Sequence, residues 1–188
     1  MTDFSHRFVL KPTCSIRDLK RLAWDLDWDI VDLRRSEAGA YVDIWITYDK
    51  RTEIHHVDDE PIGMRYLTVR GEAGDEVARQ IQENCDLWSY QEARRALRSA
   101  ADRNEKLTAV YAAALTAPAE EDGGLVAAFR EVAHDADPGV RQSVVIATGY
   151  LPWPGLVRIV DEVLTRDPVD RVRRNSELLL EGLQRGGE

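Results

Sequence analysis

The segment 55–60, with the sequence HHVDDE, holds the residue types in this chain that are best suited to chemistry. A histidine with nearby carboxylates can hold a divalent metal ion or transfer protons near neutral pH. The spacing favours a structural role, because neighbouring residues of a strand point to opposite faces and His55 and His56 then cannot both ligate one ion. The three acidic residues that follow fall where the next turn is expected. We therefore expect no metal ion here.

A second group of carboxylates alternates with large apolar residues between positions 24 and 32. Paired carboxylates can transfer protons or bind a cation when a pocket holds them. Alternation with apolar residues instead indicates the solvent-facing side of an element whose other side lies in the core. The carboxylates are Asp25, Asp27, Asp29 and Asp32, and the apolar residues are Trp24, Leu26, Trp28 and Ile30.

Signatures of catalysis are absent from the sequence. It contains no glycine-rich phosphate loop, no Gly-x-Ser-x-Gly and no His-Glu-x-x-His. Cys14 and Cys85 are far apart in sequence and have no paired spacing, which favours two reduced thiols over a disulfide or a metal site. We expect no catalytic residue, no cofactor and no metal, and the sequence favours a non-enzymatic role.

The N-terminal half alternates between patterns typical of strands and helices. Ser15 is placed to cap a helix whose apolar residues recur at steps of three and four. Short turns between the later strands predict an antiparallel meander. We therefore predict an α/β domain over residues 1–88. Its expected strands are 6–11, 28–35, 41–48, 52–57 and 64–70, and its expected helices are 15–26 and 75–85.

From Tyr90 onward the strand patterns disappear and the sequence repeats itself. The pair Val140-Arg141 recurs 32 residues later as Val172-Arg173, and an Asp-Pro pair precedes each copy. We expect Asp137 and Asp167 to be N-caps, with Pro138 and Pro168 at the first helical positions, where proline loses no hydrogen bond. The expected helices are 90–101, 106–117, 125–134, 138–151, 156–166 and 169–184.

These repeats resemble HEAT repeats, the two-helix units of α-solenoids. The resemblance covers residues 123–184 well and 90–117 loosely, and it implies about three repeats over 89–188 with the first one degenerate. It also implies a ladder of polar contacts between repeats, formed by Asp135 or Asp137 with Arg141, Asp167 and Arg173. The expected fold class is α+β: a small, mostly antiparallel sheet with one or two helices, followed by a short HEAT-like helical solenoid.

Composition restricts the partners of the chain. The net charge of its 188 residues is −9, and both halves are acidic, so the electrostatic pattern of a nucleic-acid-binding protein is missing. No apolar window approaches the roughly 20 residues that span a membrane. The N-terminus lacks the pattern of a secretory signal. We expect a cytoplasmic protein whose partner is a protein, for which the acidic charge favours a basic one, with no nucleic acid and no membrane involved.

The leading hypothesis for function is a non-enzymatic protein-binding module, either an adaptor or a specific inhibitor. A toxin-neutralising immunity protein is one version, by analogy alone. The candidate binding residues are Tyr150, Trp153 and Arg174. Trp153 lies between two prolines, and packing under the neighbouring repeat is its alternative role.

The alternative hypothesis is a small-molecule-binding protein or an enzyme with a pocket at the junction of sheet and helices. Aromatic side chains of the first half could line such a pocket, although a place in the core is the more ordinary role for them. These aromatic residues are Trp24, Trp28, Trp45, Tyr48 and Tyr66.

Overall fold

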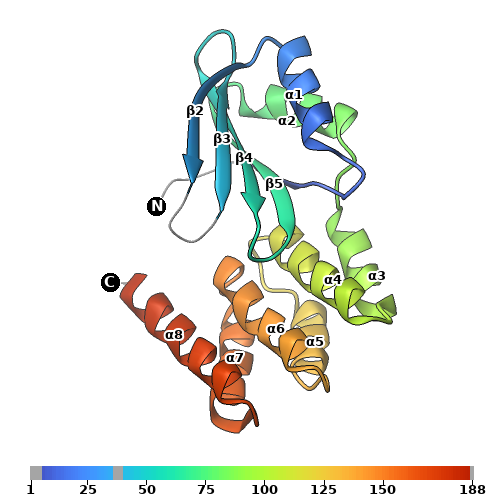
Figure 1. The fold of residues 1–188 in the computed structure, drawn as a ribbon, viewed down its shortest axis with the longest axis vertical. Coiled ribbons are helices and arrows are strands. Elements are labelled where there is room, and N and C mark those ends of the chain that lie inside the picture. The colour runs from blue at the N-terminus through green and yellow to red at the C-terminus, as the bar shows by residue number, and fades with distance from the viewer. Residues whose placement is uncertain (1–5, 36–39, 187–188) are drawn as a thin grey trace. The chain divides into compact units, whose positions relative to one another are not determined.

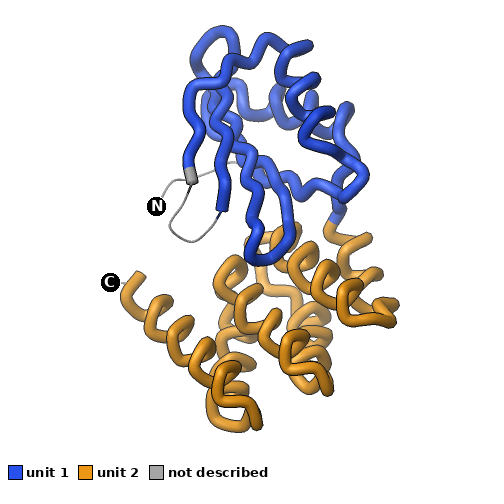
Figure 2. The backbone as a smooth tube through the Cα atoms, viewed as in Figure 1, with its two compact units in different colours: residues 1–89 blue, residues 90–188 orange. Residues whose placement is uncertain are grey.

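The computed structural model describes residues 6–35 and 40–186 (Figure 1). Contacts divide the chain into two compact units, residues 1–89 and residues 90–188 (Figure 2). The first unit holds an antiparallel sheet with helices, and the second holds helices alone. The fold is therefore α+β, as predicted.

Unit 1 contains every strand and helix that the sequence predicts for it, within residues 6–35 and 40–89. The sheet order is β1-β5-β4-β3-β2, and all neighbouring strands are antiparallel. Its elements are β1 (His6–Val9), α1 (Ile16–Asp25), β2 (Asp29–Arg35), β3 (Tyr41–Ile46), β4 (Thr52–Asp59), β5 (Met64–Gly71) and α2 (Gly74–Asn84).

The helices α1 and α2 cover one face of the sheet (Figure 1). Helix α1 begins after Ser15, as predicted, because the Ser15 hydroxyl accepts a hydrogen bond from the Asp18 amide and the Asp18 carboxylate accepts one from the Ser15 amide. The amphipathic stripe of each helix then lies on the sheet. The fully buried members of this core are Leu19, Ile54, Leu67, Val69, Val77 and Ile81.

Strand β4 is longer than predicted, so the prediction of a turn at 58–60 is wrong for its first two residues. Asp58 and Asp59 still belong to the strand and pair with Arg65 and Met64 of β5. The turn begins only at Glu60, because the glycine at position 63, with φ of 65°, takes the left-handed conformation that closes the reversal.

The predicted alternation of core and solvent over residues 24–30 is wrong at two apolar positions. Trp28 is buried as expected, but the Trp24 side chain is 83% exposed and Ile30 is also exposed. The segment is not one regular element. Helix α1 ends at Asp25, Asp27 turns the chain with a φ of 54°, and β2 then forms the edge of the sheet.

Unit 2 is a stack of helix pairs. The first helices of the pairs contact one another in the order α3, α5, α7, and the second helices do so in the order α4, α6, α8 (Figure 1). This two-layer order is what the repeat pattern predicts. The helices are α3 (Tyr90–Ser99), α4 (Arg103–Thr116), α5 (Gly123–Val132), α6 (Pro138–Tyr150), α7 (Pro154–Arg166) and α8 (Asp170–Gly186).

The start of α6 confirms the predicted cap. The Asp137 carboxylate accepts hydrogen bonds from the amides of Gly139 and Val140, at 2.6 and 3.3 Å. Pro138 occupies the first turn, where the backbone N–H that proline lacks would form no hydrogen bond within the helix.

The predicted cap of α8 is wrong. Asp167 is the C-terminal cap of α7, Pro168 lies between the helices, and α8 begins only at Asp170. The shift of 32 residues that relates the two Val-Arg pairs places Asp167 at the position of Asp135, not of Asp137. The two aspartates also bond alike, because each accepts a hydrogen bond from the backbone amide two residues later. The two Asp-Pro pairs are therefore not equivalent.

Candidate functional site

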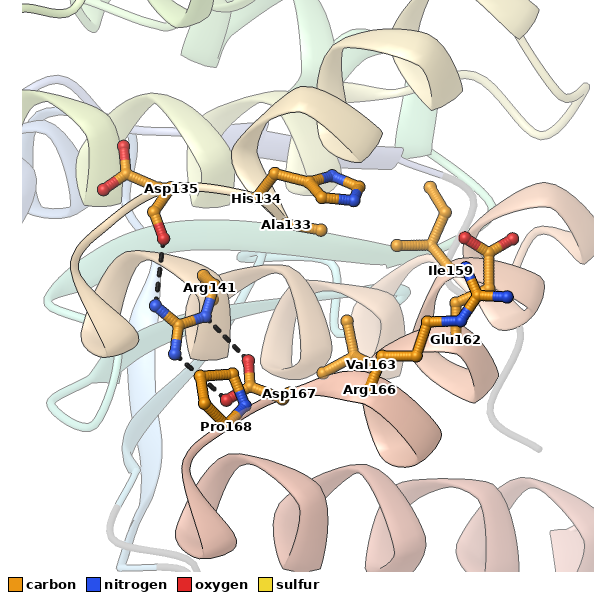
Figure 3. A pocket seen from close by; sticks show the side chains of 10 residues that line it. All are labelled: Ala133, His134, Asp135, Arg141, Ile159, Glu162, Val163, Arg166, Asp167 and Pro168. Atoms are coloured by element: carbon orange, nitrogen blue, oxygen red, sulfur yellow. Dashed lines mark hydrogen bonds and ion pairs between the residues drawn. The ribbon is translucent and has the colours of Figure 1, made fainter.

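A cleft of about 280 Å³ lies between the last two helix pairs of unit 2 (Figure 3). Its floor is apolar and is formed by Ala133, Ile159 and Val163, which are all buried. Its rim is polar or charged, apart from the ring of one proline. The rim residues are His134, Asp135, Arg141, Glu162, Arg166, Asp167 and Pro168.

One guanidinium group ties the two sides of the cleft together. Arg141 donates from Nε to Asp167 Oδ2 at 2.7 Å and from Nη2 to Asp167 Oδ1 at 3.0 Å. Its Nη1 donates to the backbone carbonyls of Asp135 and Ala136, at 2.9 and 3.1 Å (Figure 3). Both partners of the ion pair are buried. An ion pair with two hydrogen bonds, together with two bonds from the same guanidinium to backbone carbonyls, fixes the geometry between the helix pairs.

The electrostatics of this ion pair follow from its hydrogen bonds. The bonds from Arg141 hold the pKa of the Asp167 carboxyl below its ordinary value, and those to Asp167 raise the pKa of Arg141. Lys106 makes an equivalent contact one repeat earlier, with its Nζ 2.6 Å from Asp135 Oδ2, and it lowers the pKa of Asp135. Arg173 continues the series by donating to the backbone carbonyl of Asp167. These contacts form a series of polar links between successive helix pairs.

The rim offers little free negative charge. Asp135 and Asp167 are paired with basic side chains, and Glu162 is paired with Arg130. Arg166 is exposed and forms no ion pair within the part of the chain that the structure describes. The cleft can therefore take an apolar group on its floor while its rim stays close to electrically neutral.

The three binding residues predicted from sequence lie outside this cleft. Trp153 is only 5% exposed, and its Nε1 donates to the Ala119 carbonyl at 3.1 Å, so it packs against the preceding loop. Tyr150 is half-buried and Arg174 is exposed. Leu156 is buried as well, so Trp153 and Leu156 form no open apolar patch.

No motif in the sequence indicated the floor of the cleft. Ala133, Ile159 and Val163 are ordinary apolar members of two helical stripes, and their partial access depends on the spacing between helix pairs. The repeat of Val-Arg after 32 residues did indicate Arg141 and Asp167. Their role in shaping a cleft could not be read from that repeat.

The histidines of β4 point to opposite faces, as predicted. His56 is buried with Nδ1 3.5 Å from Asp43 Oδ2, while His55 Nε2 lies 3.1 Å from Glu53 Oε2. Among residues 6–35 and 40–186, no group of three or more histidine, cysteine or acidic side chains is arranged to hold a metal ion.

The carboxylates at 25, 27 and 29 are exposed, and Asp32 pairs with Arg34. The five aromatic residues considered as a pocket lining are dispersed. Trp28 and Trp45 pack in the core with ring centroids 6.5 Å apart, Tyr66 is half-buried, and the Tyr48 side chain is exposed, as that of Trp24 is.

No helix in the described ranges is both long enough and apolar enough to cross a membrane. Comparisons of the chain with protein-family models, curated proteins and solved structures give no match.

Proposed function

We propose that the chain is a non-enzymatic protein-binding module, an adaptor or a specific inhibitor, that acts in the cytoplasm through a short HEAT-like stack. The observation that supports this proposal is the cleft between the last two helix pairs. Its apolar floor and charged rim have the composition of a socket for one side chain of a partner. The Arg141–Asp167 pair holds the socket in shape before a partner arrives, which reduces the entropy lost on binding.

The expected occupant is an apolar side chain of a protein with a basic surface. The floor of Ala133, Ile159 and Val163 selects an apolar group, because a polar group would lose its hydration there without a partner. The net charge of −9 attracts a basic protein over long range and accelerates its association.

Filling the cleft tests this proposal. Ala133 lines the cleft and has a right-handed helical backbone, so Ala133→Phe places a ring in the socket with no backbone strain. Ala127→Phe is the matched control, because Ala127 lies on the same helix, is exposed and is not part of this cleft. Arg166→Glu changes the rim at an exposed position and should leave the fold intact.

The three variants and the parent chain are used as baits for affinity capture from the source organism at near-physiological salt. We expect at least one basic protein to be retained by the parent and by Ala127→Phe, to be lost with Ala133→Phe, and to be retained at least as strongly by Arg166→Glu, which replaces a positive charge of the rim with a negative one. If no captured protein shows this difference while all baits keep the parent's circular dichroism, the cleft does not bind a protein partner.

A further inference from the structure

Unit 1 contains a second cavity, of about 430 Å³, on the face of the sheet that α1 and α2 cover. It opens between the start of α1 and the edge of the sheet where β3 begins, β4 ends and β5 begins. Its walls are mostly polar, in contrast to the core beside it. The lining residues are Ile16, Lys20, Tyr41, Asp43, His56, Asp58, Gly63 and Arg65.

The strand register explains how these side chains meet. Asp43 lies directly opposite His56, and Asp58 lies opposite Arg65. Directly opposed residues of antiparallel strands share one face of the sheet. The next row of the same face, Trp45 with Ile54, is ordinary core. The face therefore changes from apolar to polar within one row of residues.

The polar row nearest the core is buried at an energetic cost. Asp43 is 3% exposed and His56 is 2% exposed. Neither ring nitrogen of His56 has a hydrogen-bond partner among the described residues, since the approach of Asp43 at 3.5 Å is too long. A buried polar group without a partner destabilises the fold, because the hydration it loses is not replaced. Leu67, in the same row on β5, shows that an apolar side chain fits there.

The mouth of the cavity carries opposite charges that are not paired with each other. Asp58 and Arg65 are cross-strand neighbours, yet they form no ion pair within residues 6–35 and 40–186. Arg65 uses one Nη2 donor on the Cys14 carbonyl, at 2.9 Å, and keeps its other donors. Lys20 is exposed and also has no carboxylate partner in the described part of the chain.

We propose that this cavity binds a small zwitterion of the α-amino-acid type. Such a ligand carries one negative and one positive group, which match the unpaired opposite charges that Arg65 and Asp58 present as cross-strand neighbours at the mouth of the cavity. The ligand carboxylate lies at Arg65 and Lys20, the ammonium group lies at Asp58 and Asp43, and His56 supplies the remaining hydrogen bond.

The state of His56 agrees with this role. Burial lowers the pKa of the imidazole, and the nearby Asp43 and Asp58 carboxylates oppose this effect only in part. The ring is therefore neutral near pH 7 and offers one donor and one acceptor.

Calorimetric titration of the full chain with each of the twenty standard amino acids tests the proposal. We expect at least one to bind at concentrations up to about 10 mM, where a millimolar affinity is measurable. The primary amide of the amino acid that binds lacks the carboxylate charge, and the N-acetyl form of that amino acid lacks the ammonium charge. Each should bind at least about tenfold more weakly, because each loses one charged hydrogen-bonding group.

Two substitutions locate the binding. Lys20→Gln and Asp58→Asn remove the unpaired charges at accessible positions, so the fold should be unaffected. Each should lower the affinity for the same amino acid by about tenfold. Arg17→Gln, on the exposed side of the same helix and outside the cavity, should leave the affinity unchanged.

Three results would overturn the proposal: no binding of any amino acid, undiminished binding of the amide or the N-acetyl form, or unchanged affinity in both pocket variants. None of them bears on the cleft of unit 2.

Discussion

Arg141 holds Asp167 through two hydrogen bonds, so a buried ion pair connects α6 with the turn that ends α7. The pair does two things at once. It satisfies both charges inside the stack, and it draws the carbonyls of the preceding turn onto the same guanidinium. The spacing of the last two helix pairs, and with it the shape of the cleft, depends on this contact.

Removing the guanidinium should destabilise unit 2 strongly. Arg141→Ala leaves the Asp167 carboxylate buried without its partner, and we expect a loss of about 3 to 5 kcal/mol in the free energy of unfolding. Arg130→Ala breaks the half-exposed pair with Glu162 and should cost less than about 1 kcal/mol. Urea unfolding followed by circular dichroism measures both values. Equal losses would mean that the Arg141 pair adds no more than a surface pair.

Acid should weaken the same stack. The pKa of Asp167 is lowered in the folded chain by its bonds to Arg141, so the unfolded chain binds this proton more readily. The stability that Asp167 contributes is complete above its unfolded pKa, near 3.8, and is lost as the pH falls through the lower folded value.

We therefore expect the urea midpoint of the parent chain to fall as the pH drops below about 4, with a shallower decline in Asp167→Asn. The variant starts from a lower stability at pH 7, so the two curves should converge in acid. Parallel curves would show that Asp167 does not couple folding to protons.

Much of the fold could be predicted because its determinants are local in sequence. Ser15 and Asp137 cap helices through amides two or three residues away, and the apolar stripes follow helical periods. The failures lie where local pattern is not enough. Trp24 is exposed because it lies in α1 outside the buried stripe of that helix. Ile30 is exposed because β2 becomes an edge strand, and the order of strands in a sheet is a long-range property.

The sites could be predicted less well than the fold. Asp43 and His56 are thirteen positions apart in the sequence and meet only because of the register between β3 and β4. The segment 55–60 did draw attention to His56, but its expected neighbours were the adjacent acidic residues. In unit 2 the repeat identified Arg141 and Asp167, while the cleft floor consists of residues that no motif marks.

The Asp43–His56 pair should reduce the stability of unit 1 relative to an apolar pair. Replacing both with Val and Leu removes two buried polar groups and leaves none unpaired, so we expect the double variant to be at least as stable as the parent. His56→Leu alone removes one of these polar groups but leaves the Asp43 carboxylate buried, so its gain in the free energy of unfolding should be smaller than that of the double variant. Thermal and urea unfolding distinguish these cases. A double variant that is less stable than the single one would show that the pair stabilises the sheet.

The close contact between α5 and α7 can be tested at two glycines that are 32 residues apart. A Cβ added at Gly155 would lie 2.9 Å from both methyl carbons of Val126, whereas one added at Gly123 meets nothing within 4 Å. Both residues lie in the first turn of a helix, where alanine is preferred to glycine by up to about 1 kcal/mol.

Gly123→Ala should therefore raise the free energy of unfolding slightly. Gly155→Ala should lower it by about 1 to 3 kcal/mol, because Val126 must move within a packed interface. Urea unfolding of the two variants measures the difference. If Gly155→Ala were as stable as Gly123→Ala, α5 and α7 would be free to separate, and the floor of the neighbouring cleft would not be rigid.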